Sequence, residues 1–242
     1  MTAETSRTTT PPYIPHIGES RQYWRDIILG VNDGLVSTFL LVAGVTGGGL
    51  TASTVLLIVI AGAVAGSISM GAGEFLATES QEEVFDREVE IEKQHIEHHR
   101  QQEVDQLWDY FRAMEIDEED LEAVVDAFTK KDVTILETMK RLEFGLVDEE
   151  RRSPYKAMVT SSGLFLLGSM TSVVPFLFVD EAGTGLTIAA VLTALGLFAV
   201  GAAKTRVTGR RPLPAGLKNL VIAGVGGIVA FIIGGLIEGA IG

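Results

Sequence analysis

Acidic and imidazole side chains recur at helical spacing in the middle of the sequence. Their separations of 4, 3, 4, 4 and 3 residues place them on one face of a predicted helix. Like charges one turn apart repel by about 0.2–0.5 kcal/mol, so such a stripe favours a nearby cation. Carboxylate with imidazole is a ligand set for Fe, Mn or Zn. The stripe contains Glu88, Glu92, His95, His99, Glu103 and Gln106.

Two residues of a later predicted helix could complete a metal site. Met139 and Glu143 are one turn apart and offer a thioether and a further carboxylate. The alternative is a helix face that is acidic only because it is solvated. Spacing alone favours this alternative.

A second group of candidate residues lies inside apolar stretches. Asp33 lies in one stretch, and Met70 lies one turn before Glu74 in the next. A charge at bilayer depth costs roughly 2.5 to 3.5 kcal/mol on insertion scales, which makes such residues functional candidates. Two carboxylates with a soft sulfur could bind a dehydrated transition-metal ion and release it on protonation. The structural alternative is a buried, hydrogen-bonded pair of acids, and Glu238 is interpreted as an interfacial residue.

The distribution of charge indicates which elements position these residues. The chain has 242 residues, a hydrophobic content of 47% and a net charge of −13. Residues 79–150 hold 24 acidic and 8 basic side chains, so a faintly basic, apolar body carries one acidic insert. This distribution excludes a nucleic-acid binder, which needs clustered Lys and Arg. The absence of Cys excludes disulfides and thiolate metal sites.

Five stretches are long and apolar enough to cross about 30 Å of hydrocarbon. They are residues 26–47, 51–78, 155–179, 186–204 and 217–241. The sequence therefore predicts an all-α membrane protein with five transmembrane helices and a cytosolic three-helix insert between the second and third. The predicted divisions are a disordered tail (1–22), two transmembrane helices (23–78), the insert (79–152) and three transmembrane helices (153–242). Small residues at helical spacing, such as Gly163 and Gly168, predict close helix packing.

Basic residues predict the orientation. Lys and Arg occur before the first stretch, beside the third, and between the fourth and fifth, whereas connections 46–53 and 180–185 contain none. The N-terminus and the insert should thus be cytosolic and the C-terminus on the opposite side. Within the insert, apolar periodicity predicts a first helix that continues from the second span to about Arg112. Asp117 and Asp132 can cap the next two helices, and Gly145 can stop the last.

Two runs of sequence closely resemble the vacuolar iron transporter family. They are DIILGVNDGLVST at 26–38 and AGSISMGAGEF at 65–75, the latter followed by SQE at 80–82. Five spans with an insert after the second match the family over nearly the whole chain. The resemblance implies a homodimer that exports cytosolic Fe²⁺ or related divalent ions in exchange for protons. It also implies that Asp33 and Met70 line the ion path, with Glu74 nearby.

The resemblance further implies a metal site in the insert. In the family this site uses Glu pairs at i, i+3 on the first long helix, with Met and Glu on the last. In this chain these positions hold Glu92 with His95, Glu103 with Gln106, and Met139 with Glu143. His95 and Gln106 replace the expected Glu residues, and Lys140 follows Met139 where a second Met can occur. The insert is therefore expected to hold fewer ions or to prefer other metals, and to lose metal as pH falls through about 6.5.

The resulting hypothesis is a proton-coupled exporter of cytosolic Fe²⁺ for iron detoxification or storage, with no tightly bound cofactor. Mn²⁺, Zn²⁺ and Co²⁺ are alternative cargoes, and a Mn²⁺ exporter on the same scaffold is the first alternative function. The second is a membrane-anchored metal sensor or buffer. A membrane enzyme is disfavoured because no Ser/His/Asp arrangement or phosphate-binding loop is found. The compact chain and its lack of an organelle signal favour a prokaryotic plasma membrane.

Overall fold

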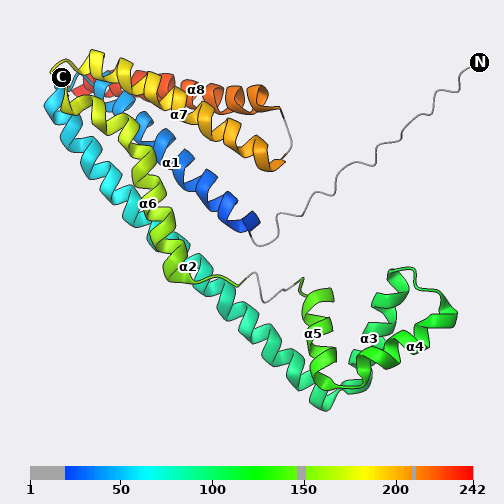
Figure 1. Cartoon of the computed structure of the whole chain (residues 1–242). Helices are drawn as coiled ribbons and strands as arrows, with labels where there is room; N and C mark the ends of the chain where they lie inside the picture. The colour runs from blue at the N-terminus through cyan, green and yellow to red at the C-terminus, as the bar shows by residue number, and fades with distance from the viewer. Residues whose placement is uncertain (1–19, 146–150, 209–210, 242) are drawn as a thin grey trace, which may run out of the picture.

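The computed structural model describes residues 20–145, 151–208 and 211–241. Helices joined by short connections make up these residues, which confirms the predicted all-α class (Figure 1). The elements are α1 (Ser20–Gly47), α2 (Ala52–His98), α3 (Arg100–Ala113), α4 (Glu118–Thr129), α5 (Asp132–Leu142), α6 (Pro154–Val173), the 3₁₀ helix η2 (Val174–Leu177), α7 (Ala182–Thr208) and α8 (Pro212–Ile241).

Five of the described helices are long and apolar enough to cross a membrane, as predicted. They are α1, α2, α6 continued by η2, α7 and α8. The helix α2 has 47 residues and is therefore about 70 Å long, more than twice the thickness of the hydrocarbon core. Its apolar first part, predicted at 51–78, is long enough to span the membrane. The remainder projects away from the bundle and leads into α3, α4 and α5 (Figure 1).

The first helix lies at the centre of the bundle, where it packs against α2, α6, α7 and α8. Glycine allows its close approach to α6. A Cβ on Gly34 would collide with the carbonyl oxygen of Phe165, and a Cβ on Gly168 would collide with that of Val31. The predicted close packing is confirmed at Gly168, whereas an added Cβ on Gly163 would meet nothing within 4 Å. The crossing fixes the backbone beside Asp33.

The first helix of the insert is broken, so the prediction of one helix running from the second span to Arg112 is wrong. The helix α2 ends just before His99, which has φ −131° and ψ 30°, and α3 begins just after it. Contacts from the other side of the insert hold this corner. The Arg100 guanidinium pairs with Asp132 and donates to the carbonyl oxygen of Thr129 at 2.6 Å. These partners are about thirty residues away, so local periodicity could not reveal the break.

The end of α2 packs with α3, α4 and α5 around a small apolar core. Its buried residues are Ile96, Leu107, Phe111, Leu121, Val125, Ile135 and Met139. Asp117 is the N-cap of α4 as predicted, although its side chain makes no capping hydrogen bond. The N-cap of α5 is Lys131 and not Asp132, whose carboxylate pairs with Arg100. Gly145 has a φ of 63° just beyond α5, as expected of a helix stop.

Some predictions fall on residues outside the described part. The predicted tail, residues 1–22, lies outside it apart from 20–22, which are the first residues of α1. Residues 146–150, near the end of the insert, also lie outside. The described part of the insert is therefore 79–145 with 151–152.

Candidate metal sites

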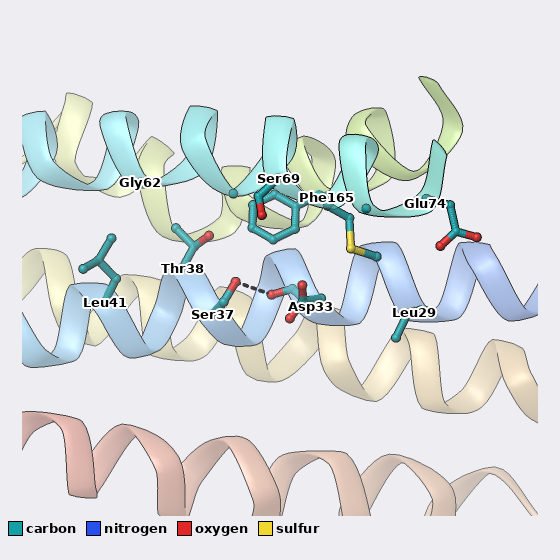
Figure 2. A pocket seen from close by; sticks show the side chains of 12 residues that line it. Leu29, Asp33, Ser37, Thr38, Leu41, Gly62, Ser69, Glu74 and Phe165 are labelled. Carbon is teal, nitrogen blue, oxygen red and sulfur yellow. Dashed lines mark hydrogen bonds between the residues drawn. The ribbon is translucent and has the colours of Figure 1, made fainter. Parts of the chain in front are cut away.

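A pocket of about 520 Å³ lies between α1 and α2, and the ring of Phe165 from α6 also lines it (Figure 2). Asp33, Met70 and Glu74, the three candidates from the apolar stretches, all contribute to its lining. Figure 2 shows Asp33 near the middle of the pocket and Glu74 farther along, toward the end from which the insert extends. Two carboxylates and a thioether within the spans therefore line one pocket.

The middle of this pocket is open on one side of the single chain. Asp33 and Ser37 are both exposed on α1. The Ser37 hydroxyl donates to the main-chain carbonyl oxygen of Asp33, as the dashed line in Figure 2 marks, and so leaves the Asp33 carboxylate available. On the facing helix, Gly62 and Gly66 line the pocket and leave it room.

The other pocket carboxylate is held by two arginines. Glu74 Oε1 lies 3.5 Å from Arg25 Nη2 and 3.5 Å from Arg152 Nη1. Arg152 also pairs with Asp26, whose side chain is only 2% exposed. Arg25 Nε lies 3.4 Å from the same Asp26 carboxylate. Four charged groups from α1, α2 and the segment before α6 therefore meet at the insert end of the pocket.

Sequence reasoning missed Asp26 and both arginines as parts of this cluster. In the sequence, Asp26 is the first residue of an apolar span and of the DIILGVNDGLVST run, and the arginines indicate only orientation. Asp26 and Arg152 are 126 residues apart. The signal that could have paired them was an acid at the edge of the first span and a basic residue at the edge of the third.

The stripe of the insert forms a three-residue cluster across the corner between α2 and α3. One ligand atom from each of Glu92, His95 and Glu103 lies within 4.8 Å of the other two. His95 Nδ1 is 3.3 Å from Glu103 Oε1 and 3.9 Å from Glu92 Oε2. Ligand atoms about 2.1 Å from one ion lie up to about 4.2 Å apart. Both His95 distances fall within this limit, so the cluster has the spacing of a candidate metal site.

The two carboxylates of this cluster are buried and incompletely paired. Glu92 and Glu103 are 1% and 3% exposed. Glu92 Oε1 and Glu103 Oε2 have no hydrogen-bond partner among the described residues. Burial, and then the charge of Glu103, raises the pKa of Glu92 to about 8. Buried carboxylate oxygens without a donor are costly, and a bound cation would supply the missing partner.

Electrostatic interactions place two further predicted residues near the cluster. Burial, and then the charge of Glu103, raises the pKa of Glu143 at the end of α5. The charges of His95 and Glu88 also act on the pKa of Glu143. Acids from α2, α3 and the end of α5 therefore share one local field, as expected of a multi-ligand site.

The other predicted ligands of the insert, Met139, Gln106 and His99, lie in three different surroundings. Met139 is fully buried in the insert core, and its main-chain carbonyl accepts from the Glu143 N–H at 2.8 Å. Gln106 is exposed on α3 and makes no hydrogen bond or ion pair with a described residue. His99 is the corner residue, with its ring centroid 6.3 Å from that of His95.

Tyr110 is a neighbour of the cluster that sequence reasoning missed. Burial, and then the charges of Glu143, Glu103 and Glu92, raises the pKa of Tyr110. Its side chain packs against the insert core, two turns after Glu103 on α3. This seven-residue spacing on the stripe helix was the available signal.

Comparison with known proteins identifies one group of relatives. The profile of the VIT family matches residues 24–235. "Vacuolar iron transporter 1" of Arabidopsis thaliana is 30% identical over 214 residues, which are 88% of this chain and 86% of that protein. The Eucalyptus grandis protein of the same name is 30% identical, over 86% of this chain and 83% of its own. "Vacuolar iron transporter 2" of Oryza sativa subsp. japonica is 31% identical, over 86% and 84%. These relatives are named as transporters, not as enzymes.

Proposed function

The chain belongs to the VIT family, and from this premise we propose that it exports cytosolic Fe²⁺ across the membrane in exchange for protons. The chain is an integral membrane protein, because five of its described helices are long and apolar enough to span a membrane. It is not an enzyme, because the members of its family are named as transporters. The proposed role is iron detoxification or storage.

The pocket between α1 and α2 is the observation that carries this proposal. It places Asp33, Met70 and Glu74 together within the membrane-spanning part of the chain. A sensor or buffer that used its spans only as an anchor would not need ionisable groups there, where they are costly. Two carboxylates with a thioether match a first-row divalent ion that has lost much of its hydration shell.

Proton exchange follows from the chemistry of these ligands. A carboxylate must be ionised to bind a cation, so protons compete with the metal for Asp33 and Glu74. Protons that enter from the far side would release the ion there and reset the carboxylates. The same oxygen ligands suit Mn²⁺, which is the leading alternative cargo, followed by Zn²⁺ and Co²⁺.

The cluster in the insert is proposed to collect the ion before it enters the pocket. Glu92, His95 and Glu103 would bind first, with Glu143 and Glu88 adding negative charge and Met139 a thioether. The unpaired oxygens of Glu92 and Glu103 support this role. In this arrangement the acidic insert raises the local concentration of divalent cations near the pocket entrance.

A second copy of the chain is proposed to cover the open side of the pocket. Asp33 is exposed on the single chain, and a carboxylate that faces lipid costs roughly 2.5 to 3.5 kcal/mol. Two copies packed through α1 and α2 would enclose Asp33 in a shared polar space. The proposed assembly is therefore a homodimer with the ion path at or near its interface.

The proposed orientation places the insert and the N-terminus in the cytosol. It rests on the basic residues at the insert end of the bundle, among them Arg25 and Arg152. The prokaryotic plasma membrane stays a prediction, since the three relatives compared with this chain come from plants.

The deciding experiment is transport by the purified chain in proteoliposomes under an imposed pH gradient. Fe²⁺, Mn²⁺, Co²⁺ and Zn²⁺ are tested separately. Transport of Fe²⁺ that stops when the gradient is collapsed supports the proposal, and transport of Mn²⁺ in preference to Fe²⁺ changes the cargo. Absence of transport for all four ions contradicts the proposal and favours the membrane-anchored sensor.

A further inference from the structure

Two arginines lie beside the carboxylate at the insert end of the transmembrane pocket. Arg152 Nη1 and Arg25 Nη2 each lie 3.5 Å from Oε1 of Glu74, the pocket carboxylate nearest the insert. The two differ in exposure: the Arg25 side chain is 65% exposed and that of Arg152 only 13%. Solvent screens an exposed pair strongly, so Arg152 is the effective counter-ion of Glu74.

Arg152 is anchored independently of Glu74. Its guanidinium also pairs with Asp26 of α1, which is almost fully buried. Its main-chain N–H donates to Glu82 on α2 at 3.2 Å. If the guanidinium leaves Glu74, these two contacts can therefore keep the residue in place, so release from Glu74 does not require unfolding of the segment.

Arg151, the residue before Arg152, also binds α2, at a position farther from the pocket. Arg151 pairs with Glu82 and Asp86, and its guanidinium lies 4.2 Å from the centre of the Phe85 ring. The segment comes directly from the end of the insert. Its two arginines thus meet acids that lie on α2 between the insert cluster at Glu92 and the pocket.

We propose that Arg152 is a tethered cation that occupies Glu74 and that an entering divalent ion must displace. This inference rests on the proposed transport function. A guanidinium and a divalent ion cannot share Glu74 Oε1 at contact distance, because like charges this close repel strongly. Arg152 therefore lowers the affinity of the pocket entrance for metal and raises the concentration at which ions enter.

The test is Mn²⁺ binding to the purified full chain in detergent, followed by the electron paramagnetic resonance signal of free Mn²⁺. Glu92→Gln with Glu103→Gln is the common background, so that the insert cluster does not contribute. In this background Arg152→Gln is compared with Arg152→Lys. The matched control is Arg151→Gln, which removes the same charge from the same segment but not from Glu74.

Arg152→Gln is expected to tighten Mn²⁺ binding roughly fivefold, because it removes a positive charge from the ion's ligand. Arg152→Lys should restore the affinity of the background protein, and Arg151→Gln should leave it unchanged. Asp26→Asn combined with Arg152→Gln also removes the buried acid that loses Arg152 as a partner, and this protein should bind Mn²⁺ as tightly as Arg152→Gln alone. Binding that is unchanged or weaker in both Arg152→Gln proteins overturns the inference.

Parallel transport assays separate this inference from the proposed function. If the wild-type chain moves none of the four ions while Arg152→Gln binds Mn²⁺ more tightly, the transport proposal fails and the competition at Glu74 stands. If the wild-type chain transports and Arg152→Gln neither tightens binding nor lowers the KM for metal, the inference alone fails.

Discussion

His95 Nδ1 lies 3.3 Å from Glu103 Oε1, although the two residues are eight positions apart. Eight residues of a straight α-helix rise about 12 Å. The corner at His99 creates the contact, because it turns α3 back beside the end of α2. The candidate metal cluster of the insert therefore depends on that corner as much as on its three acidic and imidazole side chains.

The first prediction concerns the ligands of the insert. Glu92→Gln with Glu103→Gln should raise the Kd of the insert site roughly tenfold or more, because the site loses both of its buried carboxyl ligands. Calorimetric titration of the full chain with Mn²⁺ measures the change. Glu97→Gln, an exposed acid on α2, is the matched control. An unchanged titration curve in the double variant would reassign the cluster to a solvated acidic face.

Metal binding by the insert should release protons. Burial and the charge of Glu103 raise the pKa of Glu92 to about 8, so this group is mostly protonated at pH 7 and must lose its proton to bind an ion. About one proton per ion is expected at pH 7, and affinity should rise with pH up to about 8. Titrations in buffers with different ionisation enthalpies count the protons. A count of zero contradicts a buried, protonated Glu92.

The stability of the metal-free insert should fall as pH rises. The folded state binds the Glu92 proton more tightly than the unfolded state, whose pKa is near 4.5, so folding is favoured at low pH and this advantage is lost between about 4.5 and 8. Fluorescence of Trp108, with Trp24→Phe to remove the other tryptophan, reports melting of the insert. Glu92→Gln should flatten this pH dependence. A melting temperature that rises over this range in the Trp24→Phe protein would be incompatible with a raised pKa of Glu92.

Most of the fold could be predicted from the sequence because hydropathy depends on local composition. The five spans and the three candidates Asp33, Met70 and Glu74 required only the apolar runs and the charges that interrupt them. The N-terminal end of α4 and the turn at Gly145 followed from local residue preferences.

Features that depend on distant residues could not be predicted in the same way. The break at His99 is held by Arg100 through Asp132 and Thr129. The pairing of Asp26 with Arg152 joins residues 126 positions apart at the insert end of the bundle. Helical spacing could identify the stripe from Glu88 to Gln106 as a candidate metal site, but it could not show which of its side chains lie close together.

The crossing of α1 and α6 gives a prediction about packing. Gly34→Ala should destabilise the protein by about 1–3 kcal/mol or more, because its Cβ would meet the Phe165 carbonyl oxygen. Gly163→Ala is the control on α6, since an added Cβ there meets nothing within 4 Å. Thermal unfolding in detergent compares the two. Equal melting temperatures for Gly34→Ala and Gly163→Ala would show that the two helices have room to separate at this crossing.

The most direct test of the proposed ion path is metal transport by Asp33→Asn in proteoliposomes under a pH gradient. This substitution removes the carboxylate in the middle of the pocket with little change in size. Glu238→Gln, which neutralises a carboxylate of α8 outside this pocket, is the matched control. We predict that Asp33→Asn loses at least about tenfold in transport rate while Glu238→Gln keeps the wild-type rate. Transport by Asp33→Asn at the wild-type rate would contradict the proposed ion path.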